Sequence, residues 1–144
     1  MKISIVNKSH NPLPEYKTTG SSGADVRASL SKEVLLQPQQ VEAIPTGLFF
    51  DIPEGFEIQV RPRSGFALKC GVTVLNSPGT IDSDYRGELL IILINHSKRV
   101  VKINNGDRIA QIVISRVVQV AWTQTNVLTK TKRGEGGFGS TGKK

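Results

Sequence analysis

Residues 56–61 read Phe-Glu-Ile-Gln-Val-Arg, a strict alternation of apolar and polar side chains. A period of two predicts a β-strand with one buried and one solvent-facing side. The same period recurs at Val26, Ala28 and Leu30, which predicts a second strand there. Residues 89–94 form a continuous apolar run instead, and such a run indicates a fully buried strand.

Short strands of this kind are expected along most of the chain, separated by Gly, Pro, Asn and Asp. Residues 100–103 and 108–114 flank the turn Asn104-Asn105-Gly106-Asp107 and predict a hairpin. Residues 64–70 form the one window expected to hold a helical turn or two. Residues 117–129 are expected to form a last strand and a linker. About ten short strands in one domain predict an all-β sandwich, jelly roll or barrel.

The composition fits one cytoplasmic domain. A chain of 144 residues can bury one good core but is too short for two. The single cysteine, Cys70, excludes a disulfide within the chain and is typical of a reducing compartment. The first residues, Met1-Lys2-Ile3-Ser4, lack the apolar region of a secretion signal, and no apolar run approaches the roughly 18 residues of a membrane span.

The positive charge of the chain is concentrated at its C-terminal end. The formal net charge is +7, and residues 130–144 carry five Lys or Arg and one Glu. The remaining cations are scattered singly or in pairs, whereas a nucleic-acid binder more often has a dense basic face. The pattern favours a small polyanionic ligand and argues against stable nucleic-acid binding.

Residues 130–144 read KTKRGEGGFGSTGKK, which is typical of a flexible arm that closes over an anion. The five glycines let the backbone approach a ligand closely, and Arg133 and two hydroxyls are donors that suit a phosphate. The alternative is a solvated tail without a function. We expect a β-barrel domain over residues 1–129 and an arm over residues 130–144.

Two polar segments of the body are candidates for chemistry. Residues 79–87, GTIDSDYRG, contain more acidic groups than a turn requires, and one carboxylate could act as general base for a water molecule. Residues 61–65, RPRSG, lie where a strand ends and the predicted helix begins. Ser64 is the expected N-cap, and N–H groups at a helix start attract anions. The alternative for this segment is a capped turn with solvated arginines.

Five segments taken in order closely resemble the five motifs of the trimeric dUTP diphosphatases. They are GADV at 23–26, PRSGFA at 62–67, GTIDSDYRG at 79–87, GDRIAQ at 106–111 and RGEGGFGSTG at 133–142. Two small departures are Val26, where Leu is commoner, and Pro78 before the third motif. The resemblance implies a jelly-roll-like β-barrel with one short helix and a flexible C-terminal arm.

The resemblance also implies an activity. The family hydrolyses dUTP to dUMP and diphosphate by water attack on the α-phosphorus, which limits uracil incorporation into DNA and supplies dUMP. By this likeness Asp82 is the base that deprotonates the water, and Gln111 helps to position it. Asp25 would hold a water of the Mg²⁺ shell, while the ion is bound mainly by the substrate phosphates.

The likeness assigns substrate contacts as well. Tyr85 would pack under the deoxyribose, and Asn76 with neighbouring main-chain groups would read the uracil. Phe138 would stack on the base. The phosphate and base contacts that complete the implied set are Arg63, Ser64, Gly65, Gly79, Thr80, Ile81, Arg133, Gly139, Ser140 and Thr141. In the family each site lies between subunits of a homotrimer, and a third chain donates the arm.

Two other functions stay open. A dCTP deaminase-related enzyme has the same fold and some of the motifs, although such chains are generally longer. A non-catalytic nucleotide-binding β-barrel is the second alternative. A zinc centre or a catalytic thiol is not expected, because Cys70, His10 and His96 are isolated in the sequence.

Overall fold

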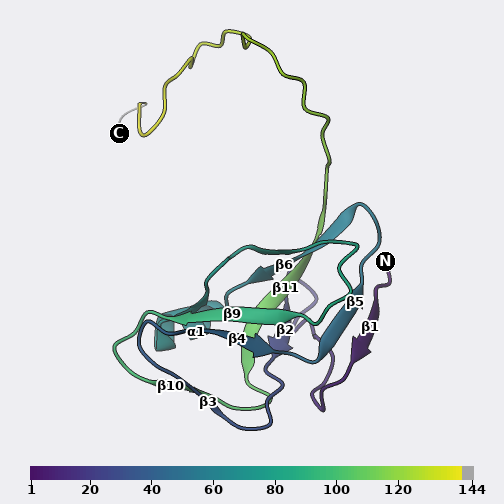
Figure 1. The fold of residues 1–144 in the computed structure, drawn as a ribbon, viewed down its shortest axis with the longest axis vertical. Helices are drawn as coiled ribbons and strands as arrows, with labels where there is room; N and C mark the ends of the chain where they lie inside the picture. Colours follow the sequence, from purple (N-terminus) through teal and green to yellow (C-terminus); the bar gives the residue numbers. More distant parts are fainter. Residues whose placement is uncertain (141–144) are drawn as a thin grey trace.

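The computed structural model describes residues 1–140, which form eleven β-strands and one short helix. In chain order the elements are β1 (Ser4–Asn7), β2 (Ala24–Arg27), β3 (Val34–Leu36), β4 (Val41–Pro45), β5 (Leu48–Asp51), β6 (Phe56–Arg61), α1 (Ser64–Cys70), β7 (Val72–Val74), β8 (Gly79–Ile81), β9 (Leu90–Asn95), β10 (Val101–Ile103) and β11 (Arg108–Arg116). The all-β prediction with one short helix is confirmed (Figure 1).

The largest sheet has four antiparallel strands in the order β2-β11-β6-β8. Strand β6 covers the residues whose alternation predicted it, and its Ile58 and Val60 are buried in the core. Gln59 lies on the other face of β6, where its side chain bonds those of Glu57 and Arg61 over 2.6 Å each. The period of two therefore fixes which side of this sheet is polar.

Three smaller sheets complete the fold, in the orders β4-β9-β7, β1-β5 and β10-β3. Strand β9 corrects the prediction of a fully buried strand. Ile91 and Leu93 are buried, whereas Leu90 is exposed and Ile92 half-buried on the opposite face. The continuous apolar run has two different surroundings, because only one face of β9 packs into the core.

The predicted hairpin of residues 100–114 does not form. Strand β10 pairs with β3, and β11 pairs with β2 and β6, so the turn between them leads from one sheet to another. Gly106 in this turn has a φ of 83° and donates its N–H to the carbonyl of Ala28 over 2.9 Å. This contact follows the end of β2 at Arg27, so β2 is shorter than the pattern at residues 26–30 predicts.

Helix α1 covers the predicted residues, but its N-cap is Arg63 and not Ser64. Ser64 is the first helical residue, and no side chain caps the helix. Gly71 ends the helix in the left-handed conformation that glycine tolerates, with its N–H bonded to the carbonyl of Ala67. Arg63 is thereby placed at the junction of β6 and α1, with its side chain directed away from the helix.

The C-terminal segment leaves the body at the end of β11 and runs far from it, as the green-to-yellow trace in Figure 1 shows. Residues 117–140 contain neither helix nor strand, so the last strand predicted within residues 117–129 is wrong for the single chain. Val118 and Trp122 are 85% and 91% exposed, because no strand of the same chain lies beside them. Among residues 1–140 no helix is both long and apolar enough to cross a membrane.

Candidate active site

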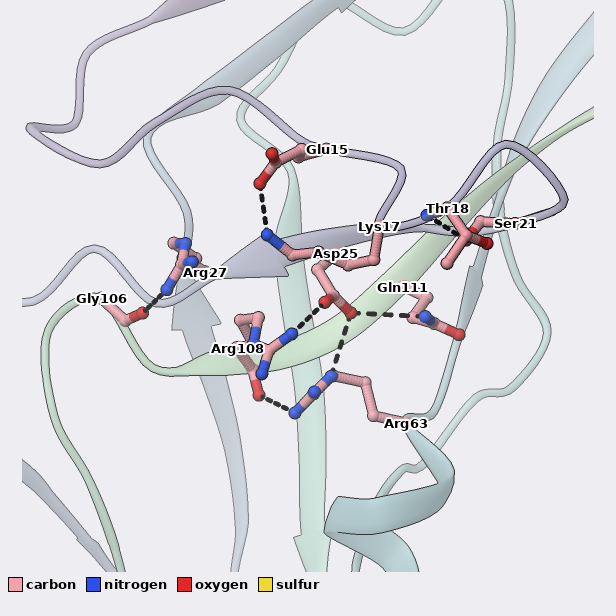
Figure 2. Close-up of polar contacts among 10 residues, drawn as sticks. All are labelled: Glu15, Lys17, Thr18, Ser21, Asp25, Arg27, Arg63, Gly106, Arg108 and Gln111. Atoms are coloured by element: carbon pink, nitrogen blue, oxygen red, sulfur yellow. Dashed lines mark hydrogen bonds and ion pairs between the residues drawn. The ribbon is translucent and has the colours of Figure 1, made fainter.

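Two of the predicted site residues, Arg63 and Gln111, meet around the buried carboxylate of a third, Asp25. Arg63 donates from Nε to Oδ1 of Asp25 over 3.0 Å, and Gln111 donates from Nε2 to the same oxygen over 3.3 Å. Arg108 donates from Nη1 to Oδ2 over 2.8 Å. Figure 2 shows these side chains converging on Asp25, and we call the four residues the Asp25 cluster.

The four-stranded sheet positions this cluster. Asp25 of β2 lies directly opposite Gln111 of β11, which in turn lies opposite Arg61 of β6. Arg63 follows the end of β6 and also donates from Nη1 to the main-chain carbonyl of Arg108 over 3.0 Å. The cluster therefore joins two sheet strands to the start of α1.

Burial of the Asp25 carboxyl acts to raise its pKa, because a charge loses solvation there. The hydrogen bond from Arg108, the positive charge and hydrogen bond of Arg63 and the hydrogen bond of Gln111 act in the opposite direction and outweigh it. The pKa of Asp25 is lowered below its ordinary value of 3.8. This carboxylate is ionised at neutral pH, so it can accept but not donate hydrogen bonds.

Ser64 and Gly65 lie in the first turn of α1, next to Arg63 in sequence, and both are exposed. The first N–H groups of a helix have no partner within the helix. Arg63 and these two residues thus bring a cation, a hydroxyl and main-chain donors to one edge of the Asp25 cluster, which suits an anion.

A second group of predicted residues lines a cavity of about 330 Å³ on another part of the surface. Asn76, Thr80, Ile81, Asp82 and Tyr85 line it together with Ala43, Glu88, Leu90 and Ile92. The apolar outer face of β9 is therefore one wall of this cavity. Asp82 also borders a larger cavity of about 730 Å³ that contains Glu54, Glu57, Asp84 and Arg86.

Gly79 is buried at the base of the second group. A Cβ added there would lie 3.0 Å from Nδ2 of Asn76 and 3.3 Å from Cβ of Val60, which is tighter than most real contacts. The absence of a side chain at Gly79 lets the Asn76 amide approach the main chain of β8.

The structure does not bring Asp82 together with Asp25 and Gln111. Gln111 of β11 lies opposite Arg61 of β6, whereas Ile81 of β8, which precedes Asp82, lies opposite Ile58 of β6. Arg61 and Ile58 are three residues apart along β6, which corresponds to about 10 Å. Across the sheet, β2 and β8 are three strand spacings apart, which corresponds to about 14 Å. One chain therefore carries two separate groups of predicted site residues, the Asp25 cluster and the group that lines the 330 Å³ cavity, and we refer to these two groups as half-sites.

The predicted arm residues lie apart from both groups. Arg133 donates from Nε to the carbonyl of Gly136 over 2.7 Å within the arm, and Phe138 is fully exposed. Gly139 and Ser140 are exposed on the same segment. Thr141 lies outside the described residues.

The Asp25 cluster is compatible with an ion that is bound mainly through a ligand. Among residues 1–140 no group of three or more His, Cys, Asp or Glu could hold a metal. A carboxylate offers about four acceptor positions, and Arg63, Arg108 and Gln111 use three of those on Asp25. One position remains for a water molecule, and Mg²⁺ typically keeps several waters and binds few protein carboxylates.

Arg108 is the member of the cluster to which the sequence assigned no role. It lies in the same GDRIAQ segment as Gln111, three residues before it. A period of two puts residues 108 and 111 on opposite faces of a regular strand. The register shift between Arg108 and Ala110 brings both to Asp25. An irregularity of this kind leaves no signal in a single sequence.

Comparison with known proteins identifies the family. The dUTPase family model matches residues 9–142. The deoxyuridine 5'-triphosphate nucleotidohydrolase of Treponema denticola is 58% identical over 90% of both chains, and that of Bdellovibrio bacteriovorus is 53% identical over 99% of this chain and 96% of its own.

Solved structures agree with this result. The dUTPase of Staphylococcus bacteriophage 80alpha with dUPNHPP superposes with a TM-score of 0.85 at 26% identity over 98% of both chains. A point mutant of it with dUpNHpp gives a TM-score of 0.87 at 25% identity. The likeness confirms the jelly-roll-like β fold that the sequence predicted. The chain belongs to the dUTPase family.

Proposed function

We propose that this protein is a dUTP diphosphatase that hydrolyses dUTP to dUMP and diphosphate. The observation that carries the proposal is the match of the dUTPase family across residues 9–142. The activity limits uracil incorporation into DNA and supplies dUMP for thymidylate synthesis.

The triphosphate binds beside the Asp25 cluster. Arg63 supplies positive charge, and Ser64 and Gly65 supply donors from the first turn of α1. Arg63 is shared between Asp25 and the phosphates, so the ion pair holds its guanidinium in place before the substrate arrives. The pairing with a nearby carboxylate thus preorganises a phosphate-binding group.

Asp82 acts as the general base. Its carboxylate accepts a proton from a water molecule whose oxygen attacks the α-phosphorus, the bond from that phosphorus to the bridging oxygen breaks, and diphosphate leaves. Gln111 orients the water through its side-chain amide. Asp82 is exposed and borders two cavities, so substrate and water can reach it.

Asp25 is the residue that would position a magnesium ion through water. Its remaining acceptor position would bind a water of the ion's shell, and the substrate phosphates would hold the ion itself. When bound, Mg²⁺ offsets negative charge on the phosphates and on the leaving diphosphate. Arg63 and Arg108 keep Asp25 ionised for this role.

The nucleoside binds in the 330 Å³ cavity. Asn76 and the main-chain groups of Gly79, Thr80 and Ile81 read the edge of the uracil, and Tyr85 packs under the deoxyribose. Leu90 and Ile92 supply an apolar wall. The small polar set and the apolar wall suit a pocket for one flat base.

A homotrimer with shared sites accounts for the separation of the two half-sites. Asp82 of one chain meets Asp25, Arg63 and Gln111 of a second chain at the interface. The exposed apolar residues of the C-terminal segment support association, since large apolar side chains of this kind are typical of contact surfaces. They are Val118, Val120, Trp122, Val127 and Leu128.

The arm of a third chain closes the site. Phe138 stacks on the uracil, and Arg133, Gly139, Ser140 and Thr141 bind the γ-phosphate. Its position away from the body of its own chain supports donation to another subunit (Figure 1). Closure excludes bulk water and requires all three phosphates, so dUDP is a poor substrate.

The proposed location is the cytoplasm, supported by the single free thiol of Cys70, which suits a reducing compartment. The scattered cations of the body support binding of a small nucleotide and no stable binding of nucleic acid or membrane.

Diphosphate release from dUTP, dCTP, dTTP and UTP, measured side by side with Mg²⁺, tests the function. We expect turnover of dUTP and little of the others, whereas ammonia release from dCTP would indicate the deaminase alternative. Asp82→Asn is expected to abolish turnover and keep nucleotide binding, and Asp84→Asn on the same loop is the matched control. Nucleotide binding without any hydrolysis by the unaltered protein would indicate a binding module.

A further inference from the structure

The ring of Tyr85 is held in place by Gly87 and Glu88, which follow it by two and three positions in the sequence. Its Oη donates a hydrogen bond to the main-chain carbonyl of Glu88 over 3.0 Å. A Cβ added at Gly87 would lie 2.3 Å from Oη and 2.4 Å from Cζ of Tyr85, far inside contact distance. The ring thus lies directly over Gly87, in space that any side chain would occupy.

Glu88 is anchored in turn to the connection between β4 and β5. Its Oε1 accepts hydrogen bonds from the N–H of Thr46 over 3.1 Å and of Gly47 over 2.7 Å. Thr46 is buried, and its hydroxyl donates to the carbonyl of Leu89 over 2.6 Å. The carbonyl of Glu88 that accepts the hydrogen bond from Tyr85 is therefore fixed by its neighbours on both sides. The Glu88 carboxylate and the Leu89 carbonyl both bond the connection between β4 and β5.

Tyr85 needs such support because its own side chain has little packing. It is 45% exposed at the rim of the 330 Å³ cavity. A ring on an exposed loop would otherwise adopt several rotamers, and only one of them can close the space under a sugar. Discrimination against a substrate with a 2′-hydroxyl group therefore depends on a Tyr85 ring that is held in one orientation.

We propose that Gly87 and Glu88 are positioning residues for sugar discrimination, which act by holding the Tyr85 ring where it leaves no room for a 2′-hydroxyl. The inference rests on the proposed function and adds to it the elements that set the specificity. Gly87 provides the space for the ring, and Glu88 links the ring to the β4–β5 turn. Gly87 does not line the 330 Å³ cavity, whereas Glu88 does, and the role proposed for Glu88 rests on its bonds to the β4–β5 turn.

The test is the ratio of kcat/KM for UTP to kcat/KM for dUTP. Gly87→Ala displaces the ring and is expected to raise this ratio about tenfold or more, with kcat for dUTP changed less than about twofold. The φ of Gly87 lies outside the left-handed region, so the backbone accepts alanine, and the three atoms nearest to the added Cβ all belong to the Tyr85 ring. An unchanged ratio in the folded Gly87→Ala protein would overturn the inference.

A double-mutant cycle separates positioning from general damage. In a Tyr85→Ala background the ring is gone, and Gly87→Ala is expected to change the ratio no further. Additive effects of the two substitutions would contradict the inference. The double variant lacks the Tyr85 atoms that lie nearest to the added Cβ, so its folding shows whether any instability of Gly87→Ala comes from the conflict with the ring.

Glu88 is tested by truncation and by conservative replacement. Glu88→Ala removes both hydrogen bonds to the β4–β5 turn and is expected to raise the UTP-to-dUTP ratio of kcat/KM several-fold. In Glu88→Gln the amide oxygen still accepts hydrogen bonds from both N–H groups, so this variant is expected to keep the original ratio. Glu33→Ala, which removes an exposed carboxylate paired with Lys102, is the matched control. Equal ratios for Glu88→Ala and Glu33→Ala would refute the role of Glu88. Absence of dUTP turnover in the unaltered protein would instead refute the proposed function itself.

Discussion

Arg108 and Arg63 bind opposite oxygens of Asp25, with Arg108 2.8 Å from Oδ2 and Arg63 3.0 Å from Oδ1. Two cations around one buried carboxylate keep it ionised and hold both guanidinium groups in fixed positions. Arg63 also donates to the main-chain carbonyl of Arg108, which links the start of α1 to the start of β11. Arg63, the proposed phosphate-binding cation, is therefore held by two partners before any ligand binds.

Arg108→Gln is expected to lower kcat for dUTP about 10- to 100-fold, the usual effect of removing a group that orients a metal-site carboxylate. Asp25 then keeps only one cationic partner, and its orientation toward the ion's water shell is lost. Steady-state kinetics at saturating Mg²⁺ measure the effect. Arg99→Gln, at an exposed position in the connection before β10, is the control and is expected to leave kcat unchanged.

Asp25→Asn is expected to alter the acid dependence of stability. The lowered pKa of Asp25 in the folded state means that its stabilisation is complete above its ordinary pKa of 3.8 and is lost as pH falls through the lower folded-state value. The stability difference between the unaltered protein and the variant should be largest near pH 7 and shrink below about pH 4.

Urea unfolding between pH 2.5 and pH 7 measures this difference. Asp51→Asn is a suitable control, because Asp51 pairs with Arg86 while both side chains are largely exposed, and exposed ion pairs contribute little to stability. A constant gap between the unaltered protein and Asp25→Asn across the pH range would show that the carboxylate charge is not what the two arginines stabilise.

Removal of residues 130–144 is expected to leave a folded protein with greatly reduced dUTP turnover. Residues 130–140 of the arm contribute nothing to the core, since the strands end at Arg116 and Phe138 is fully exposed. The truncated protein should also lose its preference for dUTP over dUDP, because the donors for the γ-phosphate are gone. Circular dichroism, light scattering and the dUTP-to-dUDP ratio of kcat/KM check these points. Unchanged kinetics would exclude a role for the arm.

The strand pattern of the fold could be predicted because it depends on local alternation. Residues 56–61 form β6 as expected, and residues 64–70 form the one helix. The pairing partners were not predictable in the same way. The turn at residues 104–107 has the composition of a hairpin turn, yet β10 and β11 belong to different sheets. Such a turn allows its two strands to pair with each other or with other strands, and contacts with residues distant in the sequence decide between these two arrangements.

The sequence predicted the site as five motifs, and the order of these motifs along the chain does not give the distances between their residues in the folded protein. The structure groups Asp25, Arg63 and Gln111 but leaves Asp82 at the other end of β6. Contacts between subunits cannot be read from a single sequence, so the division of the site between subunits stays a prediction from the resemblance to a trimeric family. The role of Arg108 was not predictable from the sequence, because its contact with Asp25 depends on an irregular register in β11.

Complementation between two inactive variants tests the shared site most directly. Asp82→Asn and Arg63→Gln are each expected to be inactive, because they damage different half-sites. After the two are mixed in equal amounts, unfolded and refolded together, random trimers should regain about one quarter of the original dUTP turnover, since half of the chains supply each intact half-site.

Arg63→Gln mixed with Arg108→Gln is the control pair, because both positions belong to the Asp25 cluster of one chain and no exchange can restore it. Recovery near one quarter for the first pair and none for the second is the result that the shared site predicts. If neither pair regains activity above that of the variants refolded alone, Asp82 and the Asp25 cluster act within one chain, and the account of a site assembled between subunits is wrong.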